Sequence, residues 1–287
     1  MNYQGDLFVE REKIVSYEEN NNALDELFKN SRKYEKSKEF MDLLEFINKF
    51  PYLSPFNAFL INTQDSSASI VLTESKWEKY GRKVKPSVRP YIIMIPFGPV
   101  SFVYNITDTY EIVEGSSSIP ESLINPFYTK GVLKRDVYDY TCRNSNKENI
   151  FCEEYEMKKN SAGYVTTRKG GDFNIYVNSL FDITAKYSTI VHELAHVYCG
   201  HLGNMINSWW SSRMGMSLDI KEIEAESVSY LVCRRLGLTT SSHEYLSNYI
   251  KEDKPLPNIS IDRILTVANY IEKMGTKEFR SKNKKIK

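Results

Sequence analysis

The sequence predicts an α+β fold in which a smaller α+β unit, residues 1–117, precedes a larger unit, residues 118–287. Three observations lead to this expectation. Short apolar runs rich in β-branched and aromatic residues occupy 69–113, a pattern typical of strands. Further along, residues 183–198 repeat apolar side chains with the period of a helix. Between these regions, the Gly- and Ser-containing stretch 114–120 is the best candidate for a linker.

The first unit is expected to be helical before its strands begin. Apolar side chains recur through 22–50 with helical spacing, and Pro51 and Pro55 end that run. Three strands are expected to follow, at 69–72, 91–95 and 100–104. The sequence Pro-Phe-Gly-Pro at 96–99 lies between the last two strands, which predicts a hairpin.

The second unit contains one clear strand before its helices. Residues 121–169 show no clear period, whereas 173–178 alternate apolar and polar side chains. If the edge of this strand is free, an extended peptide could add to it through main-chain hydrogen bonds. An ordinary strand inside a sheet explains the alternation equally well. The helix at 183–198 follows, with Asp182 as its expected N-cap and Gly200 as a residue that can end it.

Composition limits the classes of function. The chain has 287 residues, of which 41% are hydrophobic, so it can bury a substantial core. Its formal net charge of +1 gives no general demand for a polyanionic partner. No stretch resembles a membrane span or a secretory leader. Four cysteines in a chain of this length do not indicate a disulfide framework, which agrees with a reducing compartment. We therefore expect a soluble, cytoplasmic protein without a membrane partner.

The most informative residues are the pentapeptide at 192–196, His-Glu-Leu-Ala-His. On a helix, a four-residue step places His192 and His196 on one face, about 6 Å apart along the axis. Zinc accepts imidazole nitrogen, and Glu193 could take a proton from water at the metal. This is the His-Glu-x-x-His arrangement of zinc hydrolases. The alternative is a core helix whose two histidines have ordinary hydrogen-bond partners.

A third ligand is expected from the acidic segment 219–228, whose apolar periodicity predicts a second amphipathic helix. On such a helix Glu222 and Glu226 share a face, whereas Glu224 points nearly the opposite way. One of the first two could bind the metal while the other orients a ligand histidine, and spacing does not decide which. A solvated acidic face is the alternative. His201 is not expected to be a ligand, because one helix cannot easily bring three ligands to one ion.

Three runs of this sequence resemble the metallopeptidase domain of ImmA/IrrE-type and ArdC-type proteins: GDFNIYVN, HELAHVYCGHLG and EIEAESVSYLVCRRLGL. The resemblance implies a gluzincin-like metallopeptidase domain with an active-site helix and a short sheet. It implies that His192, His196 and Glu222 hold zinc, that Glu193 is the general base, and that Glu226 supports a ligand. Another divalent ion is an alternative to zinc, because nitrogen and oxygen ligands accept several metals.

Upstream, the residues at 54–60, Trp77, 81–84 and 96–100 resemble the N-terminal region of ArdC-type antirestriction proteins. That resemblance implies single-stranded DNA binding. The sequence offers aromatic and basic side chains that could stack on bases and neutralise phosphates. They are Trp77, Arg82, Lys83 and Lys85. Acidic residues are interleaved with them, so a solvated turn is the alternative.

Two functions are therefore expected to compete. The first is a zinc-dependent metallopeptidase that hydrolyses a peptide bond in a protein partner, in a regulatory or mobile-element role. The resemblance to ImmA-type proteins implies a transcriptional repressor as one such partner. The alternative is an ArdC-like antirestriction protein that binds single-stranded DNA, in which the metal site is structural or accessory.

Overall fold

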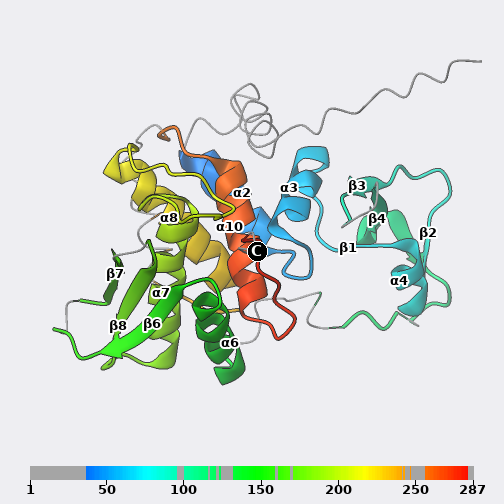
Figure 1. The fold of residues 1–287 in the computed structure, drawn as a ribbon. Helices are drawn as coiled ribbons and strands as arrows, with labels where there is room; N and C mark the ends of the chain where they lie inside the picture. The colour runs from blue at the N-terminus through cyan, green and yellow to red at the C-terminus, as the bar shows by residue number, and fades with distance from the viewer. Residues whose placement is uncertain are drawn as a thin grey trace, which may run out of the picture.

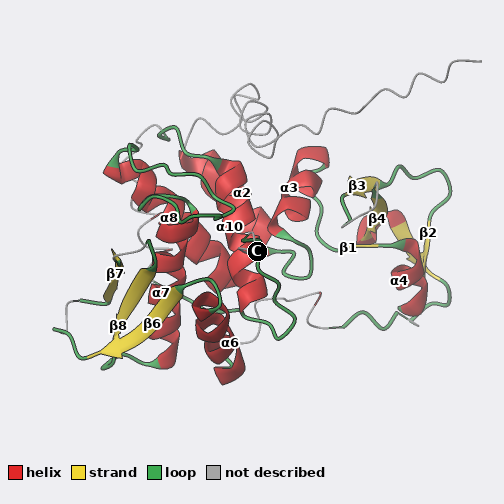
Figure 2. Ribbon diagram, viewed as in Figure 1, coloured by secondary structure: helices red, strands yellow, loops and turns green. Residues whose placement is uncertain are grey.

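The structure is a computed structural model of the chain. It describes residues 37–95, 100–115, 117–120, 123, 132–158, 161–168, 171–240, 242, 246 and 256–283. The fold is mixed α+β: packed helices carry a three-stranded sheet along one side, and a β-rich part lies at the other end (Figures 1 and 2). Across the described residues, we find no helix with both the length and the apolar character needed to cross a membrane.

The first half of the described chain contains helices followed by short strands. The helices are α2 (Ser37–Asn48), α3 (Pro55–Gln64) and α4 (Glu74–Lys79), and a 3-10 turn, η1 (Ile106–Asp108), lies among the strands. The strands are β1 (Val71–Leu72), β2 (Arg82–Val84), β3 (Tyr91–Ile93), β4 (Ser101–Asn105) and β5 (Thr109–Glu111). The second half of the expected helix at 22–50 is confirmed as α2, and its first part lies outside the described residues.

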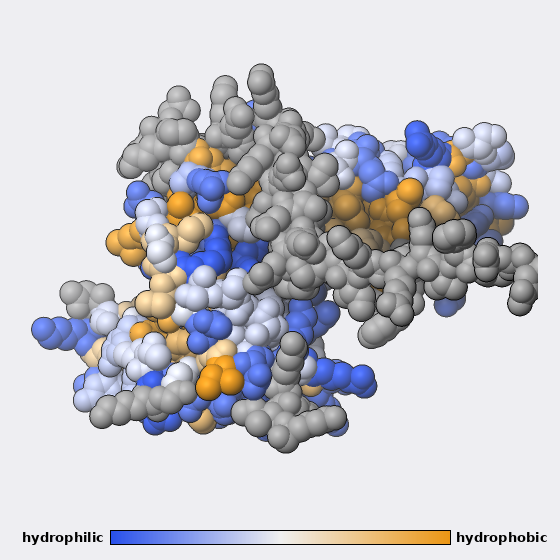
Figure 3. Space-filling model, turned by 45° about the horizontal axis from the view of Figure 1, so that its top comes forward, coloured by the Kyte–Doolittle hydropathy of each residue, from blue (hydrophilic) through white to orange (hydrophobic). Residues whose placement is uncertain are grey.

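The β-rich part consists of two small sheets. One has the order β1-β4-β3, and the other is the antiparallel pair β2-β5. The expected hairpin is confirmed, because β3 and β4 pair in antiparallel fashion with Ile92 opposite Phe102. Its turn at 96–99 lies outside the described residues. Ile92 and Phe102 are each about half exposed, at 46% and 51%, and Figure 3 shows orange apolar residues on this part of the surface.

The second half supplies the larger sheet and the remaining helices. The helices are α6 (Arg135–Asn146), α7 (Ile183–Tyr198), α8 (Leu218–Arg235) and α10 (Ile261–Met274), and the strands are β6 (Ile150–Tyr155), β7 (Gly163–Thr167) and β8 (Phe173–Asn178). The strand order is β6-β8-β7, with β6 parallel and β7 antiparallel to β8. The predicted strand at 173–178 is therefore β8, at the centre of the sheet.

Of the two alternatives for 173–178, the ordinary strand inside a sheet is the one that the structure shows. Both edges of β8 are paired, because the region without clear periodicity folds into its two neighbours, β6 and β7. The burial pattern explains why the sequence did not show this. Both neighbours carry mostly half-buried and exposed residues, whereas β8 is buried along most of its length. A strand with few buried apolar positions gives little periodic signal.

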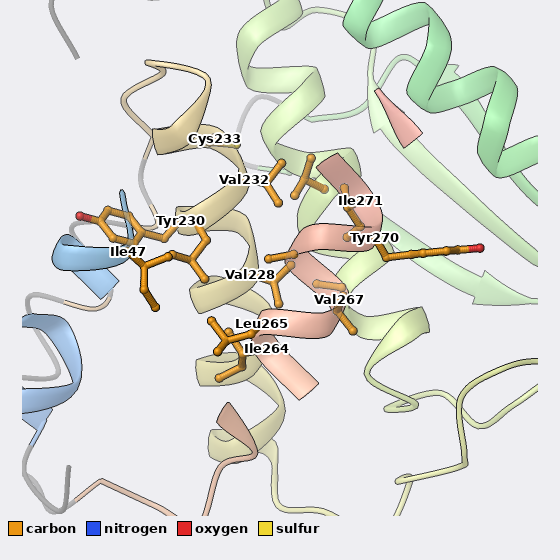
Figure 4. Close-up of a cluster of buried hydrophobic side chains, with 14 of the residues drawn as sticks. Ile47, Val228, Tyr230, Val232, Cys233, Ile264, Leu265, Val267, Tyr270 and Ile271 are labelled. Atoms are coloured by element: carbon orange, nitrogen blue, oxygen red, sulfur yellow. The ribbon is translucent and has the colours of Figure 1, made fainter. Parts of the chain in front are cut away.

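The main core forms where α8 and α10 pack against each other and against α2 (Figure 4). Ile47 of α2, Val228 of α8 and Leu265 of α10 all belong to this core. Helices α2 and α3 share this core with elements after residue 117, and the expected division at that residue stays a prediction. The strands at 71–111 have a separate small cluster around Ile70, Leu72 and Trp77.

Arg235, near the end of α8, joins these helices through a buried network. Its guanidinium donates to the backbone oxygens of Ile47 and Phe50 at 3.1 and 3.0 Å, and also to that of Leu53. The same group pairs with the carboxylate of Glu272 on α10. The arginine side chain is only 3% exposed. One side chain therefore links α8, α10 and the connection between α2 and α3.

Candidate metal centre

Helix α7 presents the two histidines from a well-defined frame. The side chain of Asp182 accepts from the backbone N–H groups of Thr184 and Ala185, which confirms it as the N-cap. Leu194 and Ala195 lie fully in the core, and this fixes the rotation of the helix. His192 and His196, one turn apart, then bring their Nε2 atoms to within 3.1 Å of each other.

Helix α8 brings the third group to the same point. One carboxylate oxygen of Glu222 lies 3.7 Å from His192 Nε2, and the other lies 3.6 Å from His196 Nε2. A tetrahedral zinc site with bonds of about 2.0–2.1 Å has donor atoms about 3.3 Å apart. The separations of 3.1–3.7 Å therefore fit one ion shared by the three residues. These residues form a group that could hold a metal ion.

The protonation state of His196 suits a ligand. Burial, together with the nearby His192 and His201, lowers the pKa of His196 to about 3. Its ring is therefore neutral at physiological pH, as a metal-ligating imidazole must be. Burial also raises the pKa of Glu222, while the charge of His192 lowers it.

Glu226 and Glu193 flank the three residues. Glu226 Oε1 lies 3.6 Å from His192 Nδ1, on the side of the ring opposite the nitrogen that faces Glu222. Glu193 accepts a hydrogen bond from the backbone N–H of Val165 in β7. Burial raises the pKa of Glu193, and the neighbouring Glu222 and Glu226 raise it further, although His192 opposes the shift. The structure thus brings together all five residues expected at this centre.

The strand beside the centre is β7, an edge strand of the sheet. Backbone bonds from Arg168 N to Asp172 O and from Asn178 N to Ala162 O fix its pairing with β8. Because paired positions alternate along an antiparallel ladder, Gly163, Val165 and Thr167 direct their backbone groups away from β8. The hydrogen bond from Val165 to Glu193 agrees with that direction. In the described part of the chain, no strand pairs with this outer edge.

A buried polar cluster behind His196 was not anticipated from the sequence. His201 Nδ1 lies 3.0 Å from His196 Nδ1, and His201 Nε2 lies 2.9 Å from Glu224 Oε2. Arg213 forms two bonds to the Glu224 carboxylate, at 2.6 and 2.7 Å. Burial raises the pKa of Glu224, but hydrogen bonds from His201 and Arg213 outweigh it and hold the pKa below its usual value. The helical spacing correctly separated Glu224 from the metal face, without indicating this cluster.

Cys199, His201 and Glu224 form a second group with metal-binding residue types. The Glu224 oxygens, however, already accept bonds from Arg213, His201 and the backbone N–H of Ser260. The guanidinium also supplies the positive charge that a cation would otherwise supply. The first group is therefore the candidate metal centre, and it does not include His201.

The four residues suggested for contact with single-stranded DNA lie in the β-rich part, and most of them are occupied by contacts within the protein. Trp77 is fully buried, and its indole N–H donates to the backbone oxygen of Tyr104 at 2.9 Å, so its ring cannot stack on a base in this fold. Arg82 is also largely buried, and its guanidinium binds Thr109 and Glu111. Lys85 donates to the backbone oxygen of Thr107 at 2.8 Å. Lys83 is also exposed, and among these four described residues it is the one whose side chain takes part in none of the hydrogen bonds given above.

Comparison with known proteins gives a distant likeness. The sequence matches no protein-family model and no curated protein. Two crystal structures of the antirestriction ArdC protein from plasmid R388 are similar to this chain. The metal-free structure has a TM-score of 0.41 and 13% sequence identity, and the alignment covers 80% of this chain and 86% of the ArdC chain. The Mn(II)-bound structure has a TM-score of 0.39 and 14% sequence identity, and the alignment covers 79% of this chain and 90% of the ArdC chain.

Proposed function

We propose that this chain is a zinc-dependent metallopeptidase with a gluzincin-like centre that hydrolyses a peptide bond in a protein partner. The observation that carries the proposal is the convergence of His192 Nε2, His196 Nε2 and the Glu222 carboxylate within 3.1–3.7 Å. Two imidazole nitrogens and one carboxylate form a donor set that zinc accepts readily, and manganese is the alternative.

The residues around the centre supply the remaining chemistry. A divalent ion held there would act as a Lewis acid, which lowers the pKa of water and polarises a carbonyl group. Glu193 lies beside the ligands but outside the group that could hold the ion. Its carboxylate accepts a proton from the attacking water and later returns that proton to the leaving amine. Glu226, near His192 Nδ1, orients that ring.

The outer edge of β7 supports a peptide as the substrate. Gly163, Val165 and Thr167 direct backbone donors and acceptors away from β8, and Val165 already contacts Glu193. An extended peptide that added to this edge would run directly past the metal centre. Main-chain hydrogen bonds of this kind give affinity without demanding a particular side-chain sequence. The strand that the sequence suggested for this role, β8, is replaced by its neighbour β7.

Digestion of a mixture of synthetic peptides of defined sequence tests the proposal. Zinc-loaded protein is expected to generate new peptide termini, identified by mass spectrometry. Chelation should stop the reaction, and added zinc should restore it. Cleavage that continues after the metal is chelated would rule out this peptidase assignment. So would a complete absence of cleavage by protein that carries one equivalent of metal.

A second candidate function is antirestriction through single-stranded DNA, with the metal centre in an accessory role. Both similar crystal structures are described as those of an antirestriction protein. Lys83 of β2 lies opposite Tyr110 of β5, and both are exposed on the same ribbon. An exposed aromatic ring beside a lysine is the pairing that single strands use for stacking and phosphate contact.

A gel-shift assay with a labelled single-stranded oligonucleotide separates the two functions. If DNA binding is the function, Lys83→Ala combined with Tyr110→Ala should weaken the shift, because one stacking and one phosphate contact are lost. Glu193→Gln should leave the shift unchanged. An absence of binding by the wild-type protein at low salt would remove this candidate.

A further inference from the structure

The buried cluster behind His196 is a continuous chain of hydrogen bonds. His196 Nδ1 lies 3.0 Å from His201 Nδ1, His201 Nε2 lies 2.9 Å from Glu224, and Glu224 forms a two-pronged ion pair with Arg213. The side chains of His201 and Glu224 have no exposure to solvent. Since water does not reach these atoms, each polar atom must find its hydrogen-bond partner within the protein.

The order of donors and acceptors along this chain is fixed from the arginine end. A guanidinium can only donate, and it keeps Glu224 as an acceptor on both oxygens. His201 must therefore carry its proton on Nε2, which leaves Nδ1 as an acceptor. It follows that His196 carries its proton on Nδ1. His196 Nε2 then carries the lone pair, and this is the atom that lies near His192 and Glu222.

The backbone after α7 explains how His201 reaches this place. Gly200 N donates to Val197 O and His201 N donates to His196 O, both at 3.0 Å, which is the bonding pattern of a Schellman motif. The motif requires a left-handed residue, and Gly200 has a φ of +78°. A Cβ atom here would collide with the backbone oxygen of Ser211. Arg213 N also donates to Gly200 O at 2.7 Å, so the same glycine anchors the arginine.

We propose that Arg213, Glu224 and His201 are positioning residues that lock His196 in its Nδ1–H tautomer and aim its Nε2 at the metal. This inference rests on the metal centre proposed above. The other histidine is held less firmly, because Glu226 lies 3.6 Å from His192 Nδ1 and both side chains are partly exposed. His196 is thus the prearranged ligand and His192 the adjustable one.

Nitrogen-15 NMR of the metal-free protein reads the tautomers directly. The expected spectrum shows His196 protonated at Nδ1 and His201 protonated at Nε2. Free imidazole side chains favour protonation at Nε2, so an Nδ1–H signal for His196 is diagnostic. A wild-type spectrum with His196 protonated at Nε2 would overturn the proposal without any variant, and it would leave the metal centre itself untouched.

Zinc affinity of two His201 variants supplies the second readout. His201→Leu removes both polar atoms and is expected to weaken zinc binding by about 10- to 100-fold. His201→Gln offers an amide oxygen to His196 and an amide N–H to Glu224, so it should recover most of that affinity. Thr141→Val removes a fully buried hydroxyl in α6, remote from the cluster in sequence, and controls for the loss of a buried polar group in general.

The outcomes separate the two proposals. Failure of the wild-type protein to bind zinc would remove the metal centre, whatever the tautomers are. Normal zinc binding by the wild type and by both variants would overturn the positioning role alone. Equal weakening of the leucine and glutamine variants would also overturn it, because only a structural loss would treat them alike. If the leucine variant does not fold, the NMR spectrum and the glutamine variant decide.

Discussion

Glu193→Gln is expected to slow peptide hydrolysis by about 100- to 10,000-fold while zinc affinity stays at the wild-type value. The amide has the shape of the carboxylate and can still accept the hydrogen bond from Val165. It cannot take up a proton at neutral pH, so the attacking water loses its base. The side chain does not belong to the group that could hold the metal, so the ligands should be undisturbed.

Initial rates and zinc content should be measured on the same sample of this variant. Glu153→Gln is the matched control, since it makes the same change at an exposed position on β6 and should leave the rate unaltered. A Glu193→Gln protein that binds zinc and cleaves at the wild-type rate would show that another group is the base. Loss of zinc with loss of rate would instead place Glu193 among the ligands.

Arg235→Ala is expected to lower the free energy of unfolding by about 3–5 kcal/mol. The substitution leaves the partly buried carboxylate of Glu272 without its partner, and desolvation already raises the pKa of this group. It also removes the donors to four backbone oxygens, from Ile47 near the end of α2 to Leu53 before α3. Arg235→Lys keeps the charge but lacks the planar fork, so an intermediate loss is expected.

Urea unfolding followed by circular dichroism measures this effect. The control is Arg280→Ala, which removes an exposed arginine and should change the stability by less than about 0.5 kcal/mol. An Arg235→Ala protein as stable as that control would contradict the linking role of this side chain.

Local signals explain the parts of the fold that the sequence predicted. The helix at 183–198 has an N-cap aspartate at 182 and a left-handed glycine at 200, and both act as their residue types suggest. The predicted strand at 173–178 also matches β8. In each case the apolar period is strong and the boundaries are marked by residues a few positions away.

The rest depends on partners that are distant in the sequence. Residues 150–155 form β6 because they pair with β8, and their own pattern is too polar to show it. Trp77 and Arg82 are residue types that bind nucleic acids. In this fold, however, Trp77 donates to Tyr104 and Arg82 binds Thr109 and Glu111, so neither side chain is exposed. Similarly, helical spacing turns Glu224 away from the metal, but only Arg213 and His201 explain its burial.

Diffraction from zinc-soaked crystals, recorded at the zinc absorption edge, is the most direct measurement of the central claim. One anomalous peak is expected about 2.0–2.2 Å from His192 Nε2, His196 Nε2 and a carboxylate oxygen of Glu222. A peak instead at Cys199, His201 and Glu224, or the absence of any peak in protein that binds zinc in solution, would contradict the assignment of the metal centre.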